Sequence, residues 1–117
     1  MTPLRSRDLK HRISIRRPNQ VSDGKGGYTT SWAPIVEAMA EVKGLDGRES
    51  VMERVLEGVS VYRIRIRWRR GLDVRASDQV RLRNGIELNI TAPAADPDGE
   101  REQLVIMAET ASARATG

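Results

Sequence analysis

The chain has 117 residues, enough for one domain, and its formal charge of +4 comes from 20 basic and 16 acidic residues. Cysteine is absent, which excludes disulfides, thiolate metal sites and cysteine nucleophiles, and no apolar run approaches the roughly 20 residues of a membrane span. Phe is also absent, with only two Trp and two Tyr, so the core is predicted to be Val, Ile, Leu and Ala. The basic excess, mostly Arg, fits either a nucleic-acid partner or a protein interface.

The first third of the chain predicts a flexible arm followed by a β-hairpin. Residues 1–10 are polar and basic, which is typical of an arm that becomes ordered on a partner. Residues 11–16 alternate, with Ile13 and Ile15 on one face, and Pro18 ends this strand or places it at a sheet edge. Residues 28–32 are rich in β-formers. We expect a hairpin over residues 11–33 whose long, flexible tip consists of Asp23, Gly24, Lys25, Gly26, Gly27 and Tyr28.

A third strand and a short helix are predicted next. Residues 35–42 alternate with the period of a strand, whereas the apolar residues between 48 and 57 recur at helical spacing. A helix this short is marginal alone, so it must dock on another element. Its outer face is either simply solvated or an acidic stripe that pairs with Arg from another copy, and it carries Glu49, Glu53 and Glu57.

Residues 59–69 give the clearest strand signal. Tyr62, Ile64, Ile66 and Trp68 face one way, and an arginine row faces the other, formed by Arg63, Arg65, Arg67 and Arg69. A slip of one residue would bury four guanidinium groups, which fixes the register. Because like charges on one face repel, the row indicates a solvated face with cross-strand carboxylates, a subunit interface, or a surface facing a polyanion. The aromatic residues lie on the opposite face, which argues against base stacking.

The remaining sequence predicts a hairpin, a loop, a last strand and a frayed tail. Residues 79–83 and 86–90 flank Asn84-Gly85, which favours a type I′ turn. A loop follows over 92–100, then a strand over 101–109, and residues 110–117 form a flexible tail. We therefore predict a mainly β chain: a small antiparallel barrel or sandwich of about seven strands with one short helix, in a single domain over residues 11–109.

Residues that could carry catalysis are scarce. His11 is the only histidine and is interpreted as an ordinary surface residue. Asp96 and Asp98 have the chemistry of a turn and lack the spacing of a calcium loop. The run from Gly24 to Gly27 precedes a strand and not a helix, so it does not fit a phosphate-binding loop. We expect no catalytic, cofactor-binding or metal-binding residues.

The ordered set of motifs resembles the head–tail joining, or head-closure (stopper), proteins of long-tailed bacteriophages and gene transfer particles. The matching elements begin with the basic strand at residues 11–18 and the glycine-rich segment at 23–28. They continue with Ala40-Glu41-Val42, residues 45–49, the strand at 62–68 and the Asn84-Gly85 hairpin. The segment at 92–99 is longer and richer in Pro than the family pattern, and the last strand lacks a frequent cysteine.

This resemblance implies a structural role without catalysis. It implies a ring of six or twelve copies at the neck of a virion or phage-like particle, between the portal or adaptor protein and the tail terminator or other tail proteins. Such a ring closes the channel, contacts packaged DNA non-specifically, and has no membrane partner. We expect the ring and partner interface at Glu49, Glu53, Glu57, Arg63, Arg65 and Arg67, with residues 23–28 as a gating or docking loop. The alternative is a stand-alone basic nucleic-acid-binding β-barrel.

Overall fold

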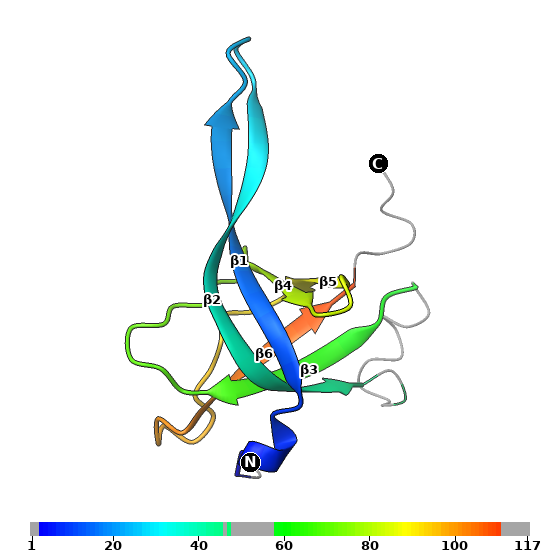
Figure 1. Ribbon diagram of the computed structural model, residues 1–117, viewed down its shortest axis with the longest axis vertical. Coiled ribbons are helices and arrows are strands. Elements are labelled where there is room, and N and C mark those ends of the chain that lie inside the picture. The colour runs from blue at the N-terminus through cyan, green and yellow to red at the C-terminus, as the bar shows by residue number, and fades with distance from the viewer. Residues whose placement is uncertain (1–2, 46, 48–57, 111–117) are drawn as a thin grey trace.

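A computed structural model describes residues 3–45, 47 and 58–110 of the chain. Its strands pair in the order β1-β2-β3-β6-β5-β4, all antiparallel, and the sheet closes into a barrel because β4 also pairs with β1. This confirms the prediction of a small, mainly β, antiparallel fold (Figure 1). The strands are β1 His11–Ser22, β2 Tyr28–Gly44, β3 Val61–Arg67, β4 Gln79–Leu82, β5 Glu87–Ile90 and β6 Gln103–Glu109.

The barrel interior is filled by aliphatic side chains from all six strands. Alternation along each strand turns one set of residues inward, as the sequence predicts for Ile64 and Ile66 on β3, both fully buried. Val74, from the connection between β3 and β4, packs against the same core. The other buried core residues are Ile13, Ile15, Ala38, Ala40, Val80, Leu88, Ile90, Leu104, Ile106 and Ala108.

The two strands predicted at residues 28–33 and 35–42 form the single strand β2. The register passes from Ile15 opposite Val36 to Arg16 opposite Pro34, so Ile35 has no partner on β1 and forms a β-bulge. Pro34 lacks an amide hydrogen, but β3 pairs with β2 only from Ala40 onward. Proline is tolerated in this part of β2 because the strand has one neighbour there. The merged strand lowers the count from about seven to six.

The turn between β4 and β5 differs from the predicted type I′ turn. Only Gly85 has a positive φ, of 91°, whereas a type I′ turn needs two such residues. The Gly85 amide donates to the Leu82 carbonyl at 2.9 Å, and the Leu82 amide donates to the Ile86 carbonyl at 2.8 Å. This pattern is a type I turn followed by a bulge at Gly85. The Asn84 side chain accepts a hydrogen bond from the Ile86 amide, which stabilises this turn without requiring a strained φ at Asn84.

Outside the barrel strands, the structure describes most of the N-terminal segment but not the predicted helix or most of the predicted tail. In the predicted N-terminal arm, residues Ser6–Asp8 form a 3₁₀ turn and Leu4 is buried. The last strand begins at Gln103, two residues later than predicted, because Arg101 adopts a φ of 58° outside the strand region. The predicted helix at 48–57, with Glu49, Glu53 and Glu57, lies outside the described residues, as do residues 111–117 of the predicted tail.

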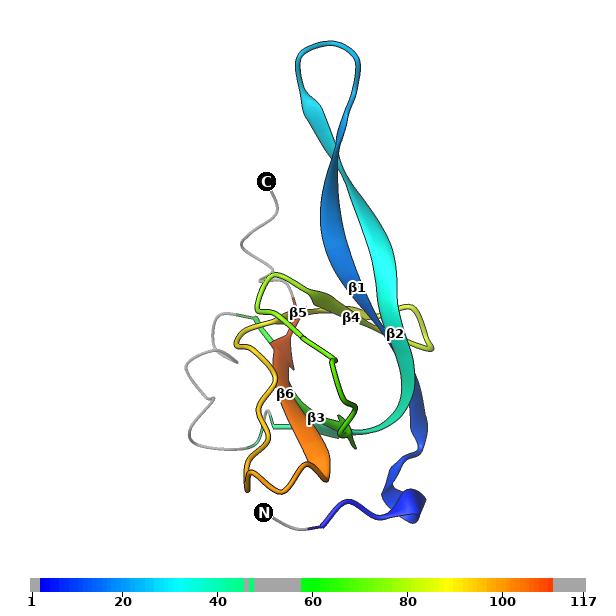
Figure 2. The same cartoon turned by 90° about the vertical axis from the view of Figure 1, so that its left-hand side faces the viewer.

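The ends of β1 and β2 leave the barrel together as a projecting hairpin, residues 17–33, drawn blue to cyan in Figures 1 and 2. The two strands stay paired as far as Ser22 and Tyr28, and the turn between them takes only residues 23–27. The hairpin rises along the longest axis of the molecule, whose extents are 50 × 36 × 25 Å. The turn therefore coincides with the predicted tip except for Tyr28, which begins β2.

The burial pattern predicts that truncating two different isoleucines changes the free energy of unfolding by very different amounts. Ile66→Ala removes a fully buried side chain, and we expect a loss of about 2–5 kcal/mol from the free energy of unfolding in urea. Ile86→Ala is the matched control, because Ile86 is 41% exposed and its truncation should change stability by about 0.5 kcal/mol or less. Equal losses for the two variants would contradict the described core.

Candidate interaction surfaces

The arginine row on β3 is not a uniform exposed face, because Arg65 is buried. Glu41 lies directly opposite Arg65 on β2 and accepts two hydrogen bonds from it, at 2.8 Å from Nε and 2.7 Å from Nη2. Gln103 accepts a third, at 3.2 Å from Nη1. The sequence left three interpretations of the row open: a solvated face with cross-strand carboxylates, a subunit interface or a polyanion-binding surface. For Arg65 the structure shows the cross-strand carboxylate, but the side chain is buried and not solvated. Only 4% of the Arg65 side chain is exposed.

The Arg65 ion pair perturbs its carboxylate. Hydrogen bonds from Arg65 hold the pKa of Glu41 below its usual value of 4.5, against the opposing effect of burial. Arg63 adds to this effect, with its Nη2 4.0 Å from Glu41 Oε1. Arg63 Nε is buried and has no hydrogen-bond partner among the described residues. One carboxylate therefore serves two arginines, and the Arg63 guanidinium is incompletely satisfied.

The rest of the arginine row contacts neighbouring backbone and the N-terminal segment. Arg67 Nη2 donates to Ser6 Oγ at 2.8 Å, and Arg69 Nη2 donates to the Glu37 carbonyl at 3.3 Å. Asp8 acts electrostatically on both Glu41 and Arg65. The described part of the predicted N-terminal arm therefore lies against the outer side of β2 and β3. Most of the row is engaged within the chain.

A second ion pair fixes the base of the projecting hairpin. Arg17 donates to Asp78 through Nε at 3.0 Å and through Nη2 at 2.9 Å, and it also donates to the Asp73 carbonyl at 2.6 Å. The Asp78 side chain is fully buried, and its Oδ2 also accepts the Arg75 amide at 2.9 Å. Burial by itself would raise the pKa of Asp78, but the Arg17 and Arg75 hydrogen bonds hold it below the usual 3.8.

Arg16, the neighbour of Arg17, contacts residues of β4, β5 and β2 at the base of the hairpin. Its Nη2 lies 2.6 Å from Gln79 Oε1 and 3.2 Å from Glu87 Oε1, while its guanidinium carbon lies 5.8 Å from the centre of the Trp32 ring. Because adjacent strand residues point to opposite faces, Arg16 and Arg17 clamp β1 from both sides. The hairpin thus leaves the barrel in a fixed direction.

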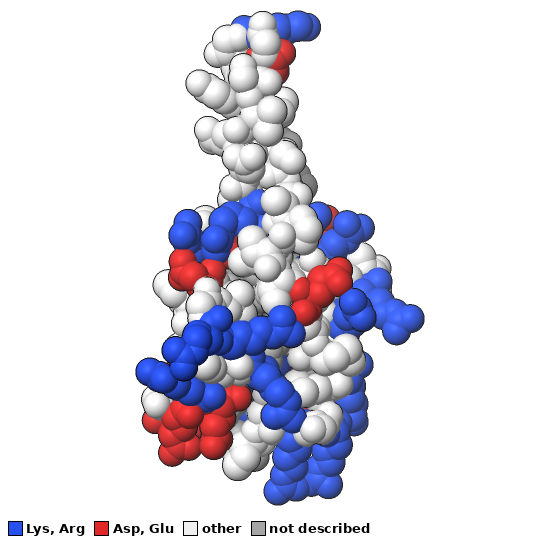
Figure 3. All heavy atoms as spheres, turned by 60° about the vertical axis from the view of Figure 1, so that its left-hand side comes forward, with Lys and Arg blue, Asp and Glu red and all other residues white. Residues whose placement is uncertain are grey.

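The projecting hairpin itself carries no charge between Arg17 and Asp23 or between Lys25 and Glu37. In Figure 3 its shaft is white, with charge at the tip and over the barrel. Tyr28 is 71% exposed and Val21 is also exposed. Within the described chain, β1 beyond Arg17 and β2 before Ala40 each have one strand neighbour, so each presents a free backbone edge.

The tip, residues 23–28, is a hydrogen-bonded turn. Asp23 Oδ1 accepts the Lys25 amide at 2.7 Å and the Gly27 amide at 3.1 Å. Gly24 and Gly26 have φ of 76° and 83°, in the region that favours glycine. A Cβ at Gly27 would lie 2.9 Å from Asp23 Oδ2. The glycines therefore allow the chain to close around the Asp23 carboxylate.

The residues considered for catalysis or metal binding are placed as follows. His11 is exposed at the start of β1. Asp96 Oδ2 accepts the Arg101 amide at 2.8 Å, which is turn chemistry, as predicted. No group of three or more potential ligands (His, Cys, Asp or Glu) gathers among residues 3–45, 47 and 58–110. In the same ranges, no helix is long and apolar enough to cross a membrane.

Sequence reasoning missed the two ion pairs. Glu41 could have been linked to Arg65, because both lie at outward positions of strands that follow each other along the chain. Arg17 and Asp78 are 61 residues apart, and no local pattern connects them.

The Arg17–Asp78 pair predicts a specific loss of stability. Asp78→Asn leaves the half-buried Arg17 guanidinium without its counter-charge, so the urea midpoint at neutral pH, followed by Trp fluorescence, should fall. Asp73→Asn is the matched control, because the Asp73 side chain is 66% exposed and bonds only to Arg75 among the described residues. Similar midpoints for the two variants would contradict a structural role for the pair.

The lowered pKa of Glu41 predicts that the fold loses stability in acid. A carboxyl group with a lowered folded pKa stabilises the fold above its unfolded pKa, and this contribution is lost as the pH falls through the folded value. For Glu41 the loss begins below about pH 4.5. The stability of Glu41→Gln should therefore fall less steeply between about pH 5 and pH 3 than that of the wild type. Glu37→Gln, which alters an exposed pair with Arg12, should keep the wild-type slope.

Comparison with solved structures places the fold among known ones. The chain is 23% identical to a Shigella flexneri 2a protein of known solution structure, with a TM-score of 0.67 over 92% of this chain and 97% of that one. It is 22% identical to a chain from the virion of a native gene transfer agent particle, with a TM-score of 0.61 over 86% and 93% of the two chains. Comparison with curated proteins finds no significant match.

The family comparison covers almost the whole barrel. The sequence profile described as phage head completion protein matches residues 4–111, from the N-terminal segment that contacts β3 to just beyond the end of β6. This confirms the resemblance drawn from the ordered motifs. The chain therefore belongs to the phage head completion protein family, a family of structural proteins of phage particles.

Proposed function

We propose that the protein is the head-closure, or stopper, subunit at the neck of a tailed phage or phage-like particle. In this proposal six or twelve copies form a ring between the portal or adaptor protein and the tail terminator or other tail proteins. The ring closes the DNA channel after packaging and offers the tail a docking surface. Membership of the head completion family supports the structural part of this role.

The observation that carries the proposal is the projecting hairpin. The barrel is closed, so its strands have partners on both sides, and free backbone edges remain on the hairpin. A neighbouring chain can pair with such an edge by β-augmentation. A hairpin held rigidly at Arg16 and Arg17 presents this edge in one orientation. A ring needs such a directional contact, because each subunit must meet the next at the same angle for the ring to close.

The expected ring contacts are refined by the side-chain positions. Arg65 is committed to Glu41 and Gln103, so it supports an interface indirectly by holding β2 against β3. The Arg63 side chain is 24% exposed and shares Glu41 with Arg65, and Arg67 is exposed, so these two offer more to a partner. We propose that Arg63 and Arg67 meet acidic residues of another copy, with Glu49, Glu53 and Glu57 as candidates. Residues 23–28 at the hairpin tip remain the proposed gating or docking element.

The alternative of a stand-alone nucleic-acid-binding barrel rests on the basic excess of the chain and on the arginine row. Arg65 bonds within the chain, and Arg67 donates to Ser6, so the row offers a polyanion few free guanidinium groups. The connector role has more support, because it uses the hairpin and agrees with the family.

Shortening the hairpin tests the proposed function. Replacing residues 20–30 by Asn-Gly keeps the Asn19–Ser31 pair and the Arg16–Trp32 contact, so the barrel should still fold. Supplied to cells that lack the native protein, this variant should yield DNA-filled heads that leak and carry no tails in electron micrographs.

The matched control keeps the hairpin length but changes side chains that leave its pairing intact. Gln20→Ser with Thr30→Ser alters one cross-strand pair of the shaft and should assemble normally. Circular dichroism and thermal unfolding establish that both variants fold. Normal tailed particles from a folded, shortened variant would overturn the proposal.

A further inference from the structure

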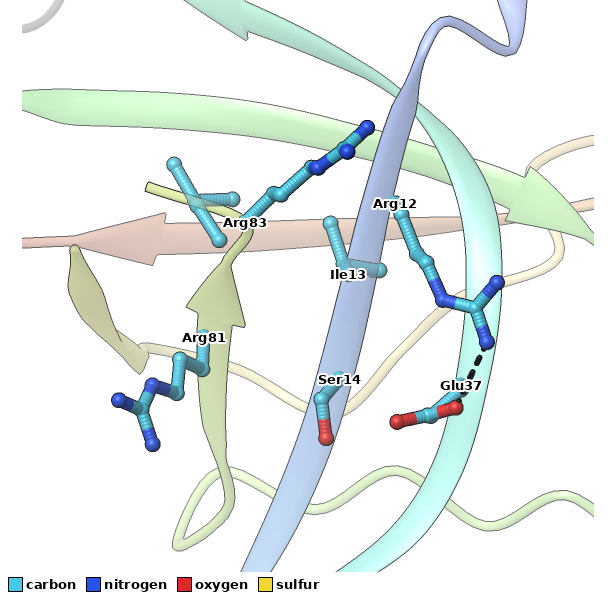
Figure 4. Close-up of a pocket in the computed structure, with 7 residues that line it drawn as sticks. Arg12, Ile13, Ser14, Glu37, Arg81 and Arg83 are labelled. Atoms are coloured by element: carbon cyan, nitrogen blue, oxygen red, sulfur yellow. Dashed lines mark hydrogen bonds and ion pairs between the residues drawn. The ribbon is translucent and has the colours of Figure 1, made fainter. Parts of the chain in front are cut away.

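A shallow groove on the outside of the barrel, between β1 and β4, is lined by three arginines that do not belong to the arginine row of β3. Its volume is about 140 Å³. Of the arginine row on β3, Arg69 approaches the groove, through the Glu37 carbonyl and a neighbouring hollow that Arg69 shares with Arg12 and Glu37. The lining residues are Arg12, Ile13, Ser14, Glu37, Arg81, Leu82 and Arg83 (Figure 4).

The charges around this groove are poorly neutralised. Arg81 and Arg83 are exposed and have no hydrogen bond or ion pair with any residue that the structure describes. Arg12 bonds to Glu37 at 2.9 Å, but both side chains are more than half exposed, so water screens the pair. Glu87 lies opposite Arg81 in the register, yet its carboxylate contacts Arg16. The groove therefore retains a net positive charge.

Positive groups continue beyond one end of the groove. Arg83 also lines a neighbouring hollow with His11, and His11 lines a third with Lys10. Shared lining residues make these hollows contiguous, so Lys10, Arg83, Arg12 and Arg81 lie along one connected stretch of surface. Asp8 and Glu41 also line the third hollow, so the positive charge is concentrated at the groove itself, around Arg12, Arg81 and Arg83. Cations that repeat along a surface suit a ligand that carries charge along its length.

The directions of the side chains indicate an extended anion and not a small one. In Figure 4, Arg83 leans over β1, Arg12 turns toward Glu37, and Arg81 points away from β1. A single phosphate or carboxylate would require donors that converge on one point. Diverging guanidinium groups instead match charges that repeat along a backbone.

The composition of the groove selects among polyanions. No aromatic side chain lines the groove itself, and Tyr62 and His11 lie in the adjoining hollow, so contact within the groove is limited to phosphates and sugars. Hot spots of protein interfaces combine aromatic residues with Arg in fully desolvated pockets, whereas this groove has exposed arginines and no aromatic residue. Both observations favour a nucleic-acid backbone over an acidic protein.

We propose that the groove between β1 and β4 binds the sugar–phosphate backbone of duplex DNA without sequence preference, through Arg12, Arg81 and Arg83. The assignment of packaged DNA as the natural ligand rests on the proposed function, whereas binding itself is a property of the groove.

Fluorescence anisotropy with the full chain and a labelled mixed-sequence DNA duplex tests the proposal. Three or four phosphate contacts predict that log K falls with log salt at a slope of about −3. Arg81→Gln with Arg83→Gln should weaken binding at least tenfold at low salt and reduce the slope by about 1.8, because two phosphate contacts are lost. A second duplex of different sequence should bind equally.

The matched control removes the same charge elsewhere. Lys25→Gln with Arg75→Gln removes one positive charge at the hairpin tip and one at the Asp73 pair, and neither residue lines the groove. This variant should keep the wild-type slope. Equal weakening in both double variants would overturn the proposal in favour of attraction by net charge. Absence of DNA binding by the wild type would also overturn it, and capture of polyglutamate in place of DNA would assign the groove to an acidic protein.

Particle assembly separates this proposal from the proposed function. If the shortened hairpin abolishes tails but the groove variant binds DNA like the wild type, the DNA site is wrong and the connector role stands. If the groove variant loses DNA binding while the shortened hairpin still supports tailed particles, the connector role is wrong and the DNA site stands.

Discussion

The ion pair between Arg17 and Asp78 sets the shape of this molecule. A two-stranded hairpin alone is only marginally stable in water, and here it extends beyond the barrel with one neighbour per strand. Arg17 joins its base to the connection that precedes β4, through two bonds to a buried carboxylate and one to a backbone carbonyl. Trp32 and Arg16 hold the opposite face. The hairpin direction is thereby linked to the packing of the barrel.

The arginines of this chain serve two physical purposes. Arg17 and Arg65 are paired with carboxylates and act as cross-links between separate elements of the barrel. Arg81 and Arg83 remain in water and leave a positive surface. Guanidinium groups suit both purposes because they pair with a carboxylate through two parallel bonds and stay charged in either setting. Composition alone therefore could not separate a nucleic-acid partner from a protein one.

Separate surfaces suit a protein that joins larger assemblies. The uncharged shaft of the hairpin offers backbone edges, whereas the barrel wall offers charge (Figure 3). A structural protein of a phage particle can therefore engage one neighbour through strand pairing and another through electrostatics.

Strand periodicity and glycine chemistry in the sequence determined the mainly β fold, the inward faces of β1, β3 and β6, and the position of the Asp23–Tyr28 turn. These features follow from contacts within a few residues, so local patterns suffice. Tertiary structure alone decided that Pro34 lies at a bulge within one long strand, that Arg65 is buried against Glu41, and that Arg17 meets Asp78. Those outcomes depend on which strands become neighbours when the sheet closes, and the pairing of distant charges is encoded only in the geometry of the closed barrel.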